Sequence, residues 1–271
     1  PATTETLYSI CSITKLFTSV AIMQLYERGK LRLDDSLSTL LPGRKIRQQF
    51  NDSGPITVRN LLTHSSGLPR ESDFPYWSGP EFKFPTREEV DSKLTDQQTL
   101  YPASTYFQYS NLGMTLLGEV VEELSGMPFH EYVEENILKP LRLKNTHATL
   151  PRELWGDQLA TGYSSITRQG TRNPLPLFDT QGIQAAAGYS STVEDLARFA
   201  SWQFRLTTNG GKEVLRASTL KEMQRVHWVD PDWKVHWGLG FAVFQQNGKT
   251  LTGHWGKRSA STLLMAVAPE R

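Results

Sequence analysis

The stretch Ser12-Ile13-Thr14-Lys15, which runs on into Leu16-Phe17-Thr18-Ser19-Val20-Ala21-Ile22-Met23-Gln24-Leu25-Tyr26, decides the fold. Between residues 16 and 26 only Thr18, Ser19 and Gln24 interrupt the apolar sequence. This pattern is typical of a helix buried on most sides rather than of an amphipathic surface helix. Gly29 is a natural C-terminal stop for such a helix. We therefore expect the rest of the chain to be organised around an interior helix.

Ser12 and Lys15 are three residues apart at the start of this helix, so their side chains share one face. A serine hydroxyl becomes a nucleophile when a base takes its proton, and burial can lower a lysine pKa from about 10.4 toward roughly 7 to 8. The N-terminal end of a helix also favours an oxyanion. The alternative is that Ser12 caps the helix and Lys15 is solvated. A second pair of the same spacing, Ser218 and Lys221, is typical of a capped surface helix.

Length and composition indicate a globular chain with a sizeable core. The 271 residues suit one large domain or two closely packed lobes. Apolar and charged fractions of 38% and 21% are ordinary for this class, and no apolar run approaches a membrane span. A formal net charge of +1 gives a nucleic-acid partner no electrostatic support.

The sequence also limits the chemistry that is expected. The single cysteine, Cys11, excludes an internal disulfide and is expected to be a small buried residue, with a thiol nucleophile as the alternative. The chain has no His-Glu-x-x-His helix, phosphate-binding glycine loop or Gly-x-Ser-x-Gly elbow. No metal and no cofactor are therefore expected.

A second group of polar residues, Tyr109-Ser110-Asn111, opens an apolar helical run that ends at Gly126. From this junction a phenol can pass a proton and an amide can hold a carbonyl. The alternative is that Asn111 caps the helix and Tyr109 packs in the core. Further helices are predicted at 57–62, 87–94, 129–138 and 193–204, His64 is interpreted as a structural loop residue, and the aromatic-rich loop 70–85 can wall a pocket.

Near the C-terminus the pattern changes to strands. Residues 240–246 and 249–254 flank Asn247-Gly248 and predict a β-hairpin, and 261–268 predicts a further strand. Three consecutive antiparallel strands indicate a sheet with the interior helix laid on it. His254-Trp255-Gly256 ends the second strand, where the glycine allows close backbone approach, so a substrate can lie along this edge. The same tripeptide recurs at 236–238, at the start of the first strand, so it carries meaning only in context.

In this order, Ser12-Ile13-Thr14-Lys15, Tyr109-Ser110-Asn111 and His254-Trp255-Gly256 resemble the three motifs of the serine β-lactamase and penicillin-binding-protein superfamily. The match is to the branch of class C β-lactamases, D-alanyl-D-alanine carboxypeptidases, D-aminopeptidases and β-lactamase-like carboxylesterases. The segments 61–68 and 191–199 also look like that branch. The resemblance implies an α+β fold, with an antiparallel sheet flanked by helices in residues 1–35 and 185–271 and a mostly helical lobe in 36–184.

The resemblance also implies roles for the motif residues. Ser12 would attack an acyl carbonyl, Lys15 would assist its deprotonation, and Tyr109 would relay a proton to the leaving group and help to activate water. Asn111 would hold the acyl side of the substrate, with His254, Trp255 and Gly256 beside it. The backbone N–H groups of Ser12 and Lys257 would bind the oxyanion. Which group is the base in such sites is disputed.

The resemblance favours the esterase and peptidase relatives, because His254 takes the place of a lysine in the lactamases proper. Lys257 and Arg258 are expected to be solvated, and aromatic residues of the 74–84 loop with Trp228, Trp233 and Trp237 to line an apolar acyl pocket. The leading function is an acyl-enzyme serine hydrolase acting on esters. A β-lactamase, a D-alanyl or D-amino-acid peptidase, an acyltransferase and a non-catalytic homologue stay open.

Two departures from the relatives are visible. The sequence Lys257-Arg258-Ser259-Ala260 is shorter and more basic than the usual loop after the third motif. Strands and a terminal helix that relatives carry are missing from both ends, so we expect a trimmed chain whose sheet lacks its edges. Localisation and oligomeric state stay open, since a signal peptide can be lost with such a start.

Overall fold

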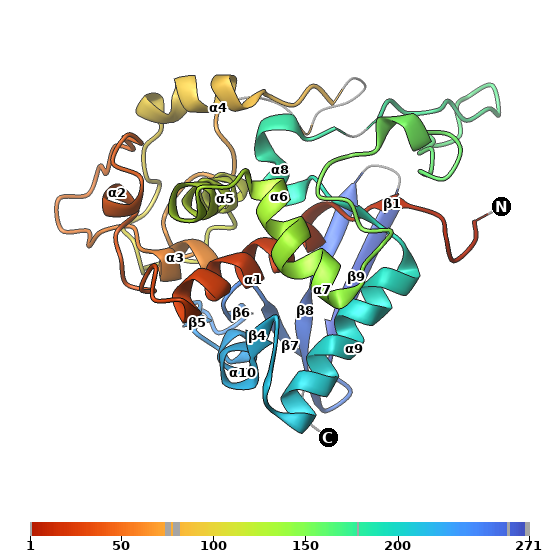
Figure 1. The fold of residues 1–271 in the computed structure, drawn as a ribbon. Helices are drawn as coiled ribbons and strands as arrows, with labels where there is room; N and C mark the ends of the chain where they lie inside the picture. The colour runs from red at the N-terminus through yellow and green to blue at the C-terminus, as the bar shows by residue number, and fades with distance from the viewer. Residues whose placement is uncertain (1, 74–76, 78–81, 178, 259–260, 269–271) are drawn as a thin grey trace.

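The computed structural model describes residues 2–73, 77, 82–177, 179–258 and 261–268 (Figure 1). Phe74 and Tyr76, which were expected to help wall a pocket, and Ser259 and Ala260 of the shortened loop lie outside the described residues. Within the described ranges, no helix combines the length and the apolar character that a membrane crossing needs.

Helix α1 (Thr14–Glu27) runs through the middle of the molecule and packs against α5 (Asn111–Ser125), α6 (Phe129–Val133) and the large sheet (Figure 1). Its residues 14–25 are all buried, so the predicted interior helix is confirmed. Its polar side chains donate to carbonyl oxygens: Thr18 Oγ1 to Ala185 at 2.6 Å, Ser19 Oγ to Lys15 at 2.7 Å and Gln24 Nε2 to Asn136 at 2.9 Å. These hydrogen bonds remove the cost of burying unpaired polar groups.

Other helices surround α1. They are η1 (Cys11–Ile13), α2 (Leu37–Leu40), α3 (Val58–Leu62), α4 (Arg87–Lys93), η2 (Leu94–Asp96), η3 (Glu134–Leu138), α7 (Lys139–Leu141), η4 (Arg152–Leu154), η5 (Gln181–Ile183), α8 (Gln184–Ala187), α9 (Val193–Asn209) and α10 (Ala217–Gln224). The four helices predicted from hydrophobic periodicity are therefore present, and α9 is longer than expected. Helix α5 approaches α8 closely because Gly118 has no side chain; a Cβ there would lie 2.5 Å from that of Ala185.

The main sheet is antiparallel, with strand order β5-β6-β7-β8-β9. Its strands are β5 (Trp228–Val229), β6 (His236–Trp237), β7 (Ala242–Gln246), β8 (Lys249–Arg258) and β9 (Ser261–Val267). Asn247 and Gly248 both have positive φ, 51° and 72°, which the tight hairpin turn between β7 and β8 requires. Helix α1 contacts β8 and α9 contacts β9, so helices cover the sheet as the α+β prediction expected.

Two small sheets complete the described strands. Strand β1 (Tyr8–Ser9) pairs with β2 (Ser190–Ser191), and β3 (Lys212–Glu213) pairs with β4 (Leu215–Arg216). Strand β1 of the first pair leads directly into η1, which carries Ser12. The division of the chain into a lobe of residues 1–35 and 185–271 and a lobe of residues 36–184 stays a prediction.

Several details differ from the sequence-based predictions. Ser110, not Asn111, is the N-cap of α5, because its Oγ accepts from the Gly113 N–H at 2.8 Å. Strand β8 continues to Arg258, so His254-Trp255-Gly256 lies within the strand and not at its end. Residues 236–237 form a separate short strand, β6. Helix α10 begins at Ala217 without a side-chain cap, and strand β4, which pairs with β3, leads directly into it.

The turn before Ser12 is pressed against strand β8. Cys11 is buried, as predicted, and adopts a φ of 48°, which few non-glycine residues do. Its Sγ donates to the carbonyl of Lys257 at 3.3 Å. A Cβ on Gly256 would lie 2.2 Å from the carbonyl oxygen of Ile10. Gly256 thus allows a close backbone approach, and the backbone that lies against it is that of the Ser12 turn; a substrate along this edge stays a prediction.

This contact predicts the effect of a minimal substitution. Gly256→Ala should push the Ser12 turn away from β8, destabilise the protein by about 1–3 kcal/mol through overpacking and lower activity more than tenfold. Thermal melts and turnover of an activated ester measure both effects. Gly43→Ala is the matched control, since a Cβ there meets nothing within 4 Å. An unchanged melting temperature and turnover in Gly256→Ala would contradict this prediction, because the Ser12 turn could then move without loss of stability or activity.

Candidate active site

Ser12 and Lys15 lie together at the start of α1. Lys15 Nζ is 3.2 Å from Ser12 Oγ, Ser12 is almost fully buried, and Lys15 is 0% exposed. Neither the start of η1 nor that of α1 has a side-chain cap, so Ser12 is not an N-cap. The alternative of a capping serine and a solvated lysine is therefore wrong.

The Lys15 amine has two further partners. It lies 2.7 Å from Asn111 Oδ1 and 2.8 Å from the Ala186 carbonyl oxygen at the end of α8. Burial, the largest cause, lowers the pKa of Lys15 to about 7, because the charged form loses its hydration. The amine is thus poised between its charged and neutral forms near neutral pH.

Tyr109 and His254 form the opposite wall of the site. The Tyr109 hydroxyl lies 3.4 Å from His254 Nε2, and His254 Nδ1 lies 2.8 Å from the Trp255 carbonyl oxygen. A carbonyl only accepts, so Nδ1 carries the ring proton and Nε2 accepts from the phenol. Burial lowers the pKa of His254 to about 3 and raises that of Tyr109, so the imidazole is neutral and the phenol keeps its proton.

His64 holds the Tyr109 segment in place. Its Nδ1 accepts from the Ser110 N–H at 3.2 Å, and its ring centroid lies 4.3 Å from that of Tyr109. Its carbonyl accepts from the Gln108 N–H at 2.7 Å. Burial holds its pKa well below the usual value, so the ring stays neutral. These contacts agree with the interpretation of His64 as a structural loop residue.

Asn111 is completely buried, and its side chain faces two groups. Its Oδ1 accepts from Lys15, and its Nδ2 donates to Glu71 Oε1. Glu71 also accepts from Trp77 Nε1 at 2.5 Å. The sequence pattern marked Asn111 but gave no sign of Glu71, which lies in the aromatic-rich loop two residues before a second acid, Asp73.

A cavity of about 280 Å³ opens beside Ser12. Its lining residues are Cys11, Ser12, Arg70, Trp77, Phe107, Tyr109, Trp237, His254, Trp255 and Lys257. Of the aromatic residues expected there, Trp77 and Trp237 line it. Trp233 instead is 75% exposed, and Phe84 belongs to the core.

The predicted third motif contributes unequally to this cavity. Trp255 is 40% exposed and packs against Phe244 in a tilted arrangement with ring centroids 4.8 Å apart, so part of its ring faces solvent. Lys257, which was expected to be solvated, is exposed as predicted, and it also lines the cavity. Arg70 was not predicted as a site residue; its guanidinium lies 5.0 Å from the centre of the Tyr109 ring.

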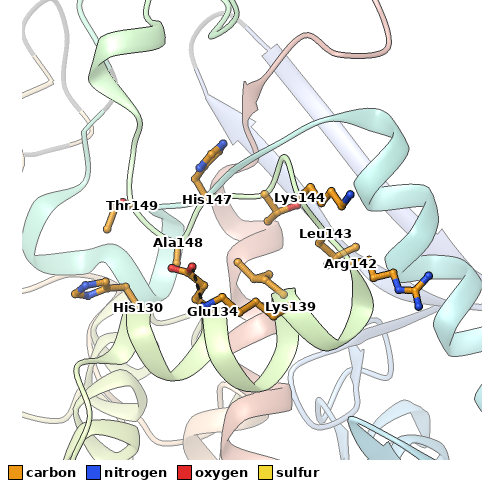
Figure 2. Close-up of a pocket in the computed structure, with 11 residues that line it drawn as sticks. His130, Glu134, Lys139, Arg142, Leu143, Lys144, His147, Ala148 and Thr149 are labelled. Carbon is orange, nitrogen blue, oxygen red and sulfur yellow. Dashed lines mark ion pairs between the residues drawn. The ribbon is translucent and has the colours of Figure 1, made fainter.

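A larger hollow of about 410 Å³ lies elsewhere, beside α6, η3 and α7 (Figure 2). Figure 2 shows the ion pair of Glu134 with Lys139 in its middle and His130 at one side, while Arg142 points away from it. None of its lining residues lines the Ser12 cavity. In the part of the chain that the structure describes, no group of three His, Cys, Asp or Glu side chains is arranged to hold a metal ion.

Comparison with known proteins identifies the class that this fold and site represent. Residues 1–271 match the family model described as Beta-lactamase, and the chain belongs to that family. The family resemblance inferred from the three motifs is thereby confirmed.

Three similar proteins illustrate the relationship. Beta-lactamase-like protein 2 of Dictyostelium discoideum is 27% identical over 264 residues, which cover 97% of this chain and 46% of that protein. D-alanyl-D-alanine-carboxypeptidase/endopeptidase AmpH of Escherichia coli K12 is 35% identical over 145 residues, 54% of this chain and 37% of that protein. The octameric penicillin-binding protein homologue from Pyrococcus abyssi superimposes with a TM-score of 0.81 at 29% identity, covering 99% of this chain and 60% of that one. The chain thus spans less than half the length of these two curated relatives.

Proposed function

We propose that the chain is a serine hydrolase in which Ser12 Oγ attacks an acyl carbonyl and forms an acyl-enzyme. The observation that carries this proposal is the 3.2 Å contact between Ser12 Oγ and the buried Lys15 amine at the floor of a cavity. A nucleophile beside a base of lowered pKa is the arrangement that acyl transfer requires.

Lys15 is the base in this proposal. When neutral, its amine has two N–H groups and one lone pair. Asn111 Oδ1, at 2.7 Å, and the Ala186 carbonyl, at 2.8 Å, accept the two N–H groups. The lone pair is then left for the Ser12 O–H. Tyr109 is a poor base by comparison, because burial raises its pKa and favours the protonated phenol.

Proton transfers accompany both the formation and the hydrolysis of the acyl-enzyme. As Ser12 Oγ bonds to the acyl carbon, its proton passes to Lys15, and the carbonyl oxygen becomes an oxyanion. Collapse of this intermediate breaks the bond to the leaving group, which takes the proton by way of the Tyr109 hydroxyl. Water then attacks the acyl-enzyme, gives a proton back through the same groups and releases Ser12 with the acid product.

The backbone N–H groups of Ser12 and Lys257 are proposed to bind the oxyanion. The Cys11 thiol contact to the Lys257 carbonyl, 3.3 Å, supports this pairing because it ties the turn that carries Ser12 to β8. Donors fixed in this way need no rearrangement during the reaction.

The substrate proposed is a carboxylic ester with a small apolar acyl group. Trp77, Phe107 and Trp237 line the cavity, and His254 is buried and neutral, so the wall that carries the third motif offers no fixed charge. A second candidate is a carboxylate-bearing D-alanyl peptide, in keeping with the carboxypeptidase name of one relative. Arg70 and Lys257 favour it, since both line the same cavity.

The nucleophile can be tested by covalent labelling. Ser12→Ala should abolish turnover and labelling by a serine-directed phosphonate, because no other hydroxyl contacts the Lys15 amine among the hydrogen bonds of the described residues. Mass spectrometry of the intact protein measures the adduct. Ser218→Ala, which alters the exposed serine of the second Ser-x-x-Lys pair, is the matched control and should label fully. Persistent labelling of Ser12→Ala would move the nucleophile elsewhere.

The substrate class needs a separate comparison. We expect kcat/KM for p-nitrophenyl butyrate to exceed that for a chromogenic cephalosporin and a D-alanyl peptide by at least about tenfold, a difference of about 1.4 kcal/mol in transition-state binding. A burst followed by turnover would indicate hydrolysis, and a burst without turnover would indicate an acyltransferase lacking its acceptor. A preference for either carboxylate-bearing substrate would overturn the ester assignment in favour of the second candidate.

A further inference from the structure

The loop after α3 is tied to the start of α5 by its backbone. The Arg70 carbonyl accepts from the Asn111 N–H at 2.8 Å, and Ser110 Oγ donates to the Pro69 carbonyl at 2.8 Å. These two bonds hold the backbone of residues 69–70 against the helix start. The next residue, Glu71, is thereby brought beside the Asn111 side chain.

Glu71 is a partly buried carboxylate whose neighbours are nitrogen groups. Its side chain is 15% exposed, and its Oε1 accepts from Asn111 Nδ2 and from Trp77 Nε1 at 2.5 Å. Arg70 Nε lies 3.3 Å from the same oxygen. A carboxylate accepts hydrogen bonds and an amide can present either end, so Glu71 selects the orientation in which the Asn111 NH₂ faces it.

The opposite end of the amide faces Lys15. With Oδ1 at 2.7 Å from the amine, Asn111 takes up a lysine N–H. In the flipped orientation the NH₂ group would face Lys15 instead and would donate to its lone pair. The lone pair would then be unavailable to the Ser12 O–H, and Lys15 could not act as the base.

We propose that Glu71 is a positioning residue for the Ser12 site: by fixing the Asn111 amide, it keeps the lone pair of neutral Lys15 directed at Ser12. The inference rests on the proposed function of Lys15 as the base. Glu71 does not line the cavity, so it acts through Asn111 and not on the substrate.

Glu71 also adds a negative charge to the surroundings of Lys15. The titratable and charged groups that face the amine are Cys11 from η1, His64 and Arg70 with Glu71 from the loop after α3, Tyr109 from the segment before α5, and His254 from β8. Burial keeps both imidazoles neutral and raises the pKa values of the thiol and the phenol. Glu71 raises the pKa of Lys15 and Arg70 lowers it, with burial the largest influence.

A pH profile separates this role from a merely structural one. In wild type, kcat/KM for p-nitrophenyl butyrate should rise with pH through the Lys15 pKa of about 7, since the neutral amine is the active form. Glu71→Gln removes the charge, so Lys15 loses its proton more easily. The acid limb should move down by roughly one pH unit, and the plateau should fall at least tenfold because the amide is no longer held in one orientation.

Two further variants complete the experiment. Glu123→Gln, on the exposed face of α5, is the matched control and should leave limb and plateau unchanged. Arg70→Gln, whose side chain is 55% exposed and should tolerate the change, removes a positive charge and should move the limb upward. Its upward movement would show that the charges of residues 70 and 71 act on the Lys15 amine, even if Glu71→Gln failed to fold.

The outcomes distinguish the inference from the proposed function. The role of Glu71 would be overturned if wild type shows an acid limb near pH 7 and both Glu71→Gln and Arg70→Gln show the same limb. The proposed roles of Ser12 and Lys15 would then stand. A wild-type protein that neither turns over the ester nor takes up the serine-directed phosphonate would overturn both. A plateau that falls at least tenfold in Glu71→Gln, together with opposite movements of the limb in the two variants and no change in Glu123→Gln, would establish the inference.

Discussion

The burial of one amine, that of Lys15, is the constraint on which the rest of the site depends. A lysine with no exposed surface loses the hydration that normally holds its pKa near 10.4, and here the pKa falls to about 7. Such a group is tolerated only if its polar contacts are satisfied. Asn111 Oδ1 and the Ala186 carbonyl accept two of its N–H groups, and Ser12 Oγ accepts a third N–H when the amine is charged and faces the lone pair when it is neutral. These three partners come from η1, α5 and α8, so the packing of these elements determines the chemistry of the amine.

Close contacts in the surrounding structure hold these elements in their relative positions. Gly118 lets α5 lie against α8, and Gly256 lets the turn before Ser12 lie against β8. His64 fixes the segment that carries Tyr109, through its Nδ1 contact to the Ser110 N–H. These contacts hold the elements that carry the site at close range. Membership of the Beta-lactamase family agrees with this arrangement.

Parts of the fold and of the site could be predicted from the sequence, because they depend on residues that are close together in the chain. The apolar run of α1, the Asn247-Gly248 turn and the Ser12, Lys15 pair each follow from short-range periodicity or spacing. The short strands β5 and β6 could not be predicted, because two residues carry no alternation and pair only where the sheet already exists.

The residues that were missed act over long range. Glu71 lies 40 positions before Asn111, and its importance comes from the backbone contacts of Pro69 and Arg70 with the start of α5. That the exposed Lys257 also lines the cavity could not be predicted, because the length of β8 beyond residue 256 depends on its pairing with β9. Ser110 and Asn111 are both good capping residues, and their contacts decide between them. Ser110 Oγ accepts from the Gly113 N–H, whereas the Asn111 side chain contacts Lys15 and Glu71.

The most direct test of the central claim is the titration of the Lys15 amine itself. NMR of protein labelled at the lysine ε-carbon, with Lys15 assigned by the signal that disappears in Lys15→Met, reports this pKa without substrate. A midpoint near pH 7 is the result expected for a buried amine that serves as the base. A midpoint close to the ordinary lysine value of about 10.4 would contradict the account, because the amine would then be charged at neutral pH and unable to take the Ser12 proton.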